Sequence, residues 1–118
     1  MEKLKFKLTT NNDVVMDMER EYFIKDDVIN FSDESNIYRY NINKHIFNKE
    51  NNESIMNIDM NKNIITFYNK ELKKEVELPL DNNDLLIKDK YIKYTYEIND
   101  NDIINIIEIS YWHHTYLW

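Results

Sequence analysis

The sequence predicts an all-β protein, folded as a single antiparallel barrel or sandwich of about eight to ten strands in a meander. Three observations lead to this prediction. Apolar and polar residues alternate along most of the chain, as in residues 3–8, which is typical of half-buried strands. Asn and Asp separate these segments at short intervals. No long segment keeps a 3.6-residue period, and Ala, the best helix former, is absent.

The strand predictions follow the alternation from one end of the chain to the other. In the second segment Met16, Met18 and Tyr22 share a face, and in the fourth Tyr38, Tyr40 and Ile42 lie opposite Ile37, Arg39 and Asn41. The segment 85–98 is the longest candidate. The predicted strands cover residues 3–8, 14–25, 28–32, 37–42, 45–48, 55–60, 64–68, 76–80, 85–98 and 103–111.

The predicted turns consist of Asn and Asp, because the chain contains no Gly. Both residue types tolerate the left-handed region of backbone space and bond to their own backbone, so here they take the place that Gly usually has in hairpins. The turns are expected at residues 11–13, 26–27, 61–63, 81–84 and 99–102.

The length of 118 residues fits one domain. We expect the barrel to occupy residues 1–111, because residues 112–118 break the charged alternation and form a C-terminal extension or an added tail. Cys is absent, which excludes disulfides and thiolate metal sites and suits a reducing compartment. The first residues alternate charged and apolar side chains and lack the apolar run of a signal peptide, so we expect a cytoplasmic protein.

The charge of the chain argues against two classes of partner. The net charge is −7, and no basic stripe is present that would neutralise nucleic-acid phosphates or bind an anionic membrane surface. We therefore expect neither nucleic acid nor membrane as a partner. The sequence leaves open whether the protein is a monomer or a homodimer.

The sequence also lacks the motifs of common enzymes and cofactor sites. Phosphate-binding loops, dinucleotide fingerprints, nucleophile elbows and EF-hands all need Gly. His113 and His114 point to opposite faces of a strand and are poorly placed to chelate one ion. The acidic pairs at residues 81 and 84 and at residues 100 and 102 are explained by turn chemistry better than by calcium binding. We expect no catalytic residue, no metal and no cofactor, which favours a protein that is not an enzyme.

The candidate ligand-binding residues are one arginine and several tyrosines. Counting by twos along the second segment places Arg20 on the apolar face, where a buried guanidinium needs an acidic side chain or a carboxylate ligand. Arg20 could instead reach water at the end of the barrel. Rows of tyrosines usually form core or rim, and they can also line a ligand cavity. The candidates are Arg20, Tyr22, Tyr38, Tyr40, Tyr94 and Tyr96.

Several stretches resemble the YwiB-like proteins, a small bacterial family of unknown function with a calycin-like, or lipocalin-like, β-barrel. Residues 22–32 match its early aromatic strand, tight turn and second strand, and Ser54-Ile-Met-Asn-Ile-Asp-Met is similar to its central Ser-x-Met-x-Phe segment. Residues 91–99 and 105–111 are similar to its closing hairpin. The family carries glycines around the central segment, whereas residues 61–71 of this chain contain none. The resemblance implies a calycin-type barrel and supplies no active site.

These observations support one leading functional hypothesis and two alternatives. The leading hypothesis is a non-enzymatic binding module that holds a small apolar or acidic ligand in the barrel or a protein partner at a sheet edge. A small enzyme that uses the barrel cavity, with Arg20 and nearby tyrosines as electrostatic groups, is the first alternative. A structural or inhibitor-like interaction protein is the second. A filled interior would argue against the internal ligand and against cavity chemistry.

Overall fold

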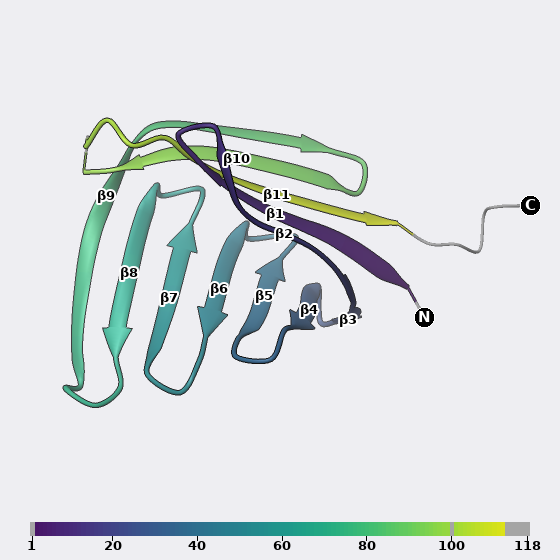
Figure 1. The fold of residues 1–118 in the computed structure, drawn as a ribbon, viewed down its shortest axis with the longest axis horizontal. Coiled ribbons are helices and arrows are strands. Elements are labelled where there is room, and N and C mark those ends of the chain that lie inside the picture. The colour runs from purple at the N-terminus through teal and green to yellow at the C-terminus, as the bar shows by residue number, and fades with distance from the viewer. Residues whose placement is uncertain (1, 100, 113–118) are drawn as a thin grey trace, which may run out of the picture.

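Eleven strands follow one another along the computed structural model, which describes residues 2–99 and 101–112 (Figure 1). Their bounds are β1 (Lys3–Thr10), β2 (Asp13–Glu21), β3 (Phe23–Lys25), β4 (Val28–Ser32), β5 (Ile37–Asn41), β6 (Ile46–Glu50), β7 (Ser54–Asp59), β8 (Ile64–Asn69), β9 (Lys74–Lys88), β10 (Tyr91–Ile98) and β11 (Asn105–Trp112).

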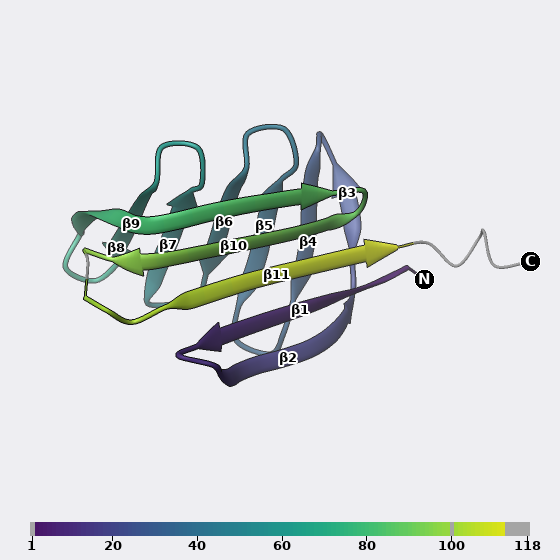
Figure 2. The ribbon, with the colours of Figure 1, turned by 90° about the horizontal axis from the view of Figure 1, so that it is seen from above.

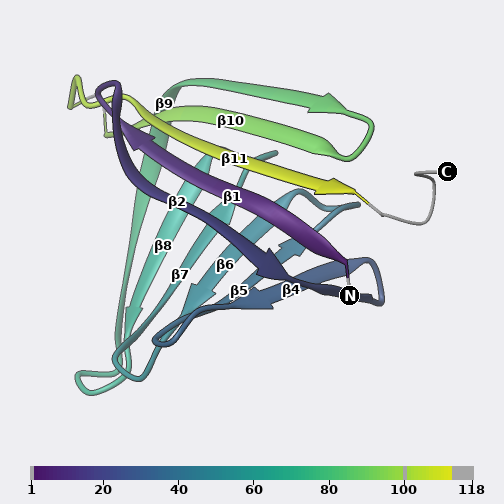
Figure 3. The same ribbon diagram turned by 45° about the vertical axis from the view of Figure 1, so that its right-hand side comes forward.

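The strands form one antiparallel meander that is nearly closed into a barrel, in the order β2-β1-β11-β10-β9-β8-β7-β6-β5-β4-β3. Two layers cross each other (Figures 2 and 3). One layer contains β2, β1, β11, β10 and the second half of β9. The other contains the first half of β9 and β8 to β3. The long strand β9 therefore turns one corner of the barrel, and Tyr22, the single residue between β2 and β3, turns the other.

The predicted fold class is confirmed. Among the described residues the structure is all-β without helix, and consecutive strands are mostly neighbours in the sheet, as a meander requires. The strand count exceeds the predicted range because β2 and β3 are separated by one residue. No helix in the described ranges has the length and apolarity needed to cross a membrane.

Two predictions about the region around residue 85 are wrong. The expected turn at residues 81–84 lies inside β9, where Asn82 adopts a φ of 46° and the register against β10 shifts at a bulge. The side-chain amide of Asn83 donates to the carbonyl of Leu80 at 2.7 Å and supports this bulge. The reversal occurs instead between Lys88 and Tyr91, so the segment 85–98 is not one strand. An Asn in the left-handed region suits a β-bulge as well as a turn, so the residues at 81–84 do not tell a bulge from a turn.

Several of the hairpin loops between the strands share one construction. In the loop after β7 the Asp59 carboxylate accepts hydrogen bonds from the amides of Asn61 and Lys62, and Asn63 has a φ of 57°. Asn41 starts the loop after β5 in the same way, and Asn69 accepts one such bond in the loop after β8. Of the described residues with positive φ, most are Asn or Asp; the exceptions are His45, Lys73 and Lys90. The predicted role of Asn and Asp in place of Gly is confirmed for these turns.

Replacing Lys73 by Gly should stabilise the protein by about 0.5–1 kcal/mol. Lys73 has a φ of 53°, where a Cβ costs roughly 1–2 kcal/mol. Part of the gain is lost because Gly increases the conformational freedom of the unfolded chain. Urea denaturation measures the difference. The neighbouring Leu72→Gly variant is the control, because Leu72 is not among the residues with positive φ and its replacement should destabilise the protein or leave it unchanged. Loss of stability in Lys73→Gly would contradict this explanation.

The core lies between the two layers and consists mainly of aromatic and branched aliphatic side chains. Phe6 of β1 packs against three rings of the opposite layer, with centroid distances of 5.2 Å to Phe31, 5.1 Å to Tyr38 and 5.6 Å to Phe47. Tilted and offset ring pairs at this spacing add to the free energy that burial contributes. The middle of the barrel is therefore occupied by the protein's own rings.

Candidate functional site

The five tyrosines of the predicted site are all buried. Tyr38, Tyr40 and Tyr94 are completely inaccessible, and Tyr22 and Tyr96 are nearly so. The predicted faces are correct, because Tyr38 and Tyr40 point inward while Ile37, Arg39 and Asn41 do not. Tyr38 packs with Phe6, Phe31 and Phe47, whereas Tyr94 stacks on Tyr96 at 5.3 Å.

Three of these tyrosines have internal partners for their hydroxyl groups. The Tyr94 hydroxyl donates to Asn63 Oδ1 at 2.9 Å, and the Tyr40 hydroxyl lies 2.5 Å from His45 Nδ1. Burial raises the pKa of Tyr40 and of Tyr94, and it raises the pKa of Tyr96 to about 12. These rings behave as core residues whose polar ends are bound by nearby loops.

The carboxylate of Asp33 accepts hydrogen bonds from the hydroxyl of Tyr38 and from backbone amides of the loop between β4 and β5. Its Oδ1 accepts hydrogen bonds from the amides of Ser35 and Asn36, both at 2.8 Å, and its Oδ2 accepts one from Tyr38 at 2.9 Å. Burial alone would raise the pKa of Asp33, but the hydrogen bonds outweigh it and lower the pKa. Burial and the neighbouring carboxylate raise the pKa of Tyr38. The pair therefore joins a buried ring to a surface turn.

The predicted burial of Arg20 is wrong. Arg20 pairs with Leu4 of β1, which is fully buried, so counting by twos gave the correct face. However, β2 is the outermost strand of the sheet, and the guanidinium is exposed and donates to the carbonyl of Glu19 at 2.9 Å. A long side chain at a sheet edge reaches water without crossing the core. Arg20 thus follows the second interpretation, in which the charge reaches water.

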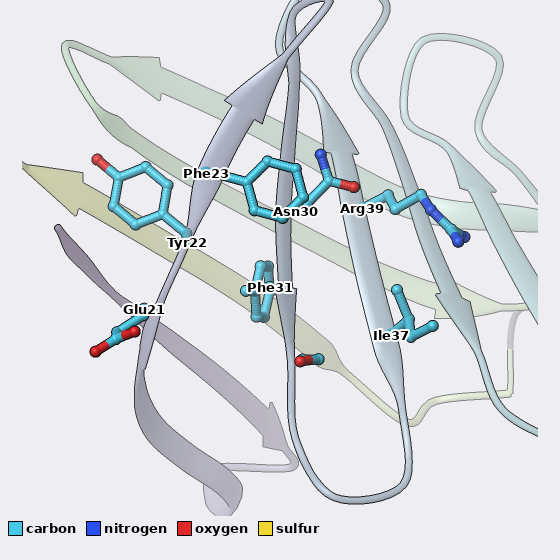
Figure 4. Close-up of a pocket in the computed structure, with 8 residues that line it drawn as sticks. Glu21, Tyr22, Phe23, Asn30, Phe31, Ile37 and Arg39 are labelled. Atoms are coloured by element: carbon cyan, nitrogen blue, oxygen red, sulfur yellow. The ribbon is translucent and has the colours of Figure 1, made fainter. Parts of the chain in front are cut away.

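A hollow of about 520 Å³ lies instead on the outside, where β2, β3, β4 and β5 meet (Figure 4). Phe23 pairs with Asn30, and Asn30 pairs with Arg39, so these three side chains form a row on the outer face of the sheet. Two apolar side chains there are unusually accessible: Phe23 is 61% exposed and Ile37 is 46% exposed. The remaining lining residues are Glu21, Tyr22, Phe31 and Ser32.

Arg39 supplies the positive charge of this hollow. Its Nη1 donates to Asn48 Oδ1 at 3.1 Å and to Glu50 Oε1 at 3.2 Å, and the second oxygen of Glu50 accepts from Lys70 at 2.8 Å. These bonds from Lys70 and Arg39 lower the pKa of Glu50. Both of these guanidinium bonds come from Nη1, and the side chain is 40% exposed. Figure 4 shows the guanidinium turned away from Phe23 and Asn30, so its other nitrogens are available to an acceptor at the β6 side of the hollow.

The backbone beside the hollow is an incomplete sheet edge. β3 has three residues and pairs with Val28, Ile29 and Asn30 of β4. In the described part of the chain no strand pairs with Phe31 and Ser32 on that side. Since a free edge presents unpaired backbone donors and acceptors, an extended segment could continue the ladder there.

Sequence reasoning missed this hollow. The pattern places Arg39 opposite the tyrosines and does not mark it as a candidate ligand-binding residue. Phe23 falls inside the predicted strand 14–25. A local signal did exist, because Phe23 and Ile37 are large apolar residues at positions that the alternation assigns to the outer face.

The described residues contain no group of three or more His, Asp or Glu side chains that could hold a metal ion. His113 and His114 lie outside the described residues, as does the rest of 113–118, whereas Trp112 is the last residue of β11. Comparison of the sequence with models of protein families and with curated proteins gives no match.

Proposed function

We propose that this protein is a non-enzymatic binding domain that takes an extended segment of a protein partner at the outer hollow between β2 and β5. The observation that carries the proposal is the combination of exposed Phe23 and Ile37 with the available donors of Arg39, next to an incomplete strand edge. Exposed apolar side chains rimmed by polar ones are typical of interaction surfaces. The packed aromatic centre of the barrel supports an outer site over an internal ligand.

The chemistry of the hollow indicates the kind of segment that fits. Added backbone would bond to β4 beyond Asn30, an apolar side chain would cover Phe23 and Ile37, and a carboxylate would accept from Arg39. A segment that alternates apolar and acidic residues meets these conditions. A cytoplasmic location and membership of the YwiB-like family remain parts of this proposal.

The proposal can be tested by selecting peptides from a random library against the immobilised protein and measuring their affinity. We expect the selected peptides to contain an acidic and an apolar residue and to lose at least about tenfold in affinity against Arg39→Gln, since bonds to charged groups contribute about 1.5–3 kcal/mol. Phe23→Ser should weaken binding similarly. Arg20→Gln is the matched control, because Arg20 is exposed but does not line the hollow, and it should bind like the wild type.

A second candidate function is the binding of a small carboxylate ligand in the same hollow, which the donors of Arg39 favour. A hollow of about 520 Å³ falls within the usual size range of ligand pockets. Native mass spectrometry of the purified protein distinguishes the two. A bound small acid that is lost in Arg39→Gln would favour this second candidate. A peptide affinity that is unchanged in both Arg39→Gln and Phe23→Ser would contradict the outer site altogether.

A further inference from the structure

The second half of β9 is a free sheet edge at the other corner of the barrel. Residues 74–79 pair with β8, and the strand then crosses into the other layer, where residues 84–88 pair with β10. On its other side no strand in the described ranges pairs with residues 84–88. Figure 2 shows this part of β9 as the outermost strand of its layer.

This edge carries two exposed apolar side chains between two opposite charges. Leu86 is 39% exposed and Ile87 is 50% exposed, and both Asp84 and Lys88 are exposed. Leu85 and Ile87 pair with the core residues Tyr94 and Ile92 of β10, so they point inward, and the exposure of Ile87 results from its position at the edge. An extended partner strand would cover it.

We propose that this edge binds the same edge of a second copy of the chain, in an antiparallel ladder centred on Leu86. In such a ladder a two-fold axis places Leu86 opposite Leu86 of the second copy. Leu85 then lies opposite Ile87 of the second copy, and Asp84 lies opposite Lys88 of the second copy. The segment 84–88 of one copy is therefore complementary, in both apolar character and charge, to the same segment of the second copy.

The β2 edge is not complementary to itself in this way. β2 is bulged between Met16 and Val14, and Asp17, Glu19 and Glu21 alternate along its exposed side. Pairing β2 with itself would bring these carboxylates together, which is a common protection of free edges. The segment 84–88 has no bulge, because the register shift of β9 ends before Asp84.

The association should be weak, because a ladder of five residues is small beside the roughly 1,200–2,000 Å² of stable interfaces. We expect a dissociation constant on the order of tens of micromolar. The dimer leaves the outer hollow untouched, since no residue of 84–88 lines it, so this inference is independent of the proposed function.

Charge reversal tests the pairing directly, by sedimentation equilibrium up to about 1 mM protein. Asp84→Lys places like charges opposite each other twice in the dimer, and Lys88→Asp does the same, so each should weaken dimerisation by about tenfold. The double variant Asp84→Lys/Lys88→Asp restores opposite charges and should dimerise within a few-fold of the wild type. Asp17→Lys, the same charge change on the β2 edge, is the control and should not weaken dimerisation.

Three results would overturn the inference: a wild type that is monomeric at 1 mM, single variants that dimerise as well as the wild type, or a double variant that does not recover. Circular dichroism of each variant checks that it is folded. Because both altered side chains are exposed and have no hydrogen bond or ion pair among the described contacts, we expect all variants to fold.

Discussion

Replacing Phe6 by Ala is expected to destabilise the protein by about 3–5 kcal/mol, a large share of the roughly 5–15 kcal/mol that holds a typical domain together. Phe6 is completely buried and belongs to β1, whereas the three rings around it, Phe31, Tyr38 and Phe47, belong to the opposite layer. Its removal leaves a cavity between the layers that the β strands on either side cannot easily close. Urea denaturation gives the difference in free energy of unfolding.

Phe23→Ala is the matched control for this prediction. It removes the same side chain from a position that is 61% exposed, so the stability should change by no more than about 0.5 kcal/mol. Equal losses in the two variants, or a loss below about 1 kcal/mol for Phe6→Ala, would show that the two layers are not joined by this aromatic cluster.

Removing the carboxylate of Asp33 should also be costly, at about 2–3 kcal/mol in Asp33→Ala. The change takes away the acceptor of the Ser35 and Asn36 amides and leaves the hydroxyl of the buried Tyr38 without it. Tyr38→Phe removes one of these bonds and should cost about 1 kcal/mol. In the Tyr38→Phe background Asp33→Ala should therefore cost less than it does in the wild type.

The same carboxylate gives the stability a dependence on acid. Because the pKa of Asp33 is lower in the folded protein than in the unfolded chain, its contribution is complete above the unfolded pKa of about 3.9 and is lost as the pH falls through the folded pKa. The stability difference between wild type and Asp33→Asn should therefore shrink as the pH falls below about 4. A difference that stays constant between pH 6 and pH 2.5 would contradict the lowered pKa.

The sequence was sufficient to predict the fold class, because alternation is a local property and each strand carries it independently. The pattern places Tyr38 and Tyr40 on one face for this reason, and both are fully buried. The same pattern does not say where a strand lies in the sheet. Arg20 was given its correct face, but only the pairing of β2 at the edge of the sheet explains why that face is exposed there.

The hollow was harder to predict, because no segment of the chain contains it. Phe23, Asn30 and Arg39 become neighbours only through the register of β3, β4 and β5. The corner in β9 was missed for a related reason. The bulge at Asn82 has the Asn and Asp residues that are typical of a turn, whereas the reversal after Lys88 places Lys90 in the left-handed region, where a turn is not expected from the sequence.

Mapping the bound peptide by amide chemical shifts is the most direct test of where this protein binds. In a titration of the labelled protein with a selected peptide, we expect the largest shifts at residues 21–23, 30–32 and 37–39, which surround the outer hollow. The amides beside Phe6 and Tyr94, in the packed interior, should change little. Shifts centred on those interior residues, or a selection that enriches no peptide at all, would contradict a binding site on the outside of the barrel.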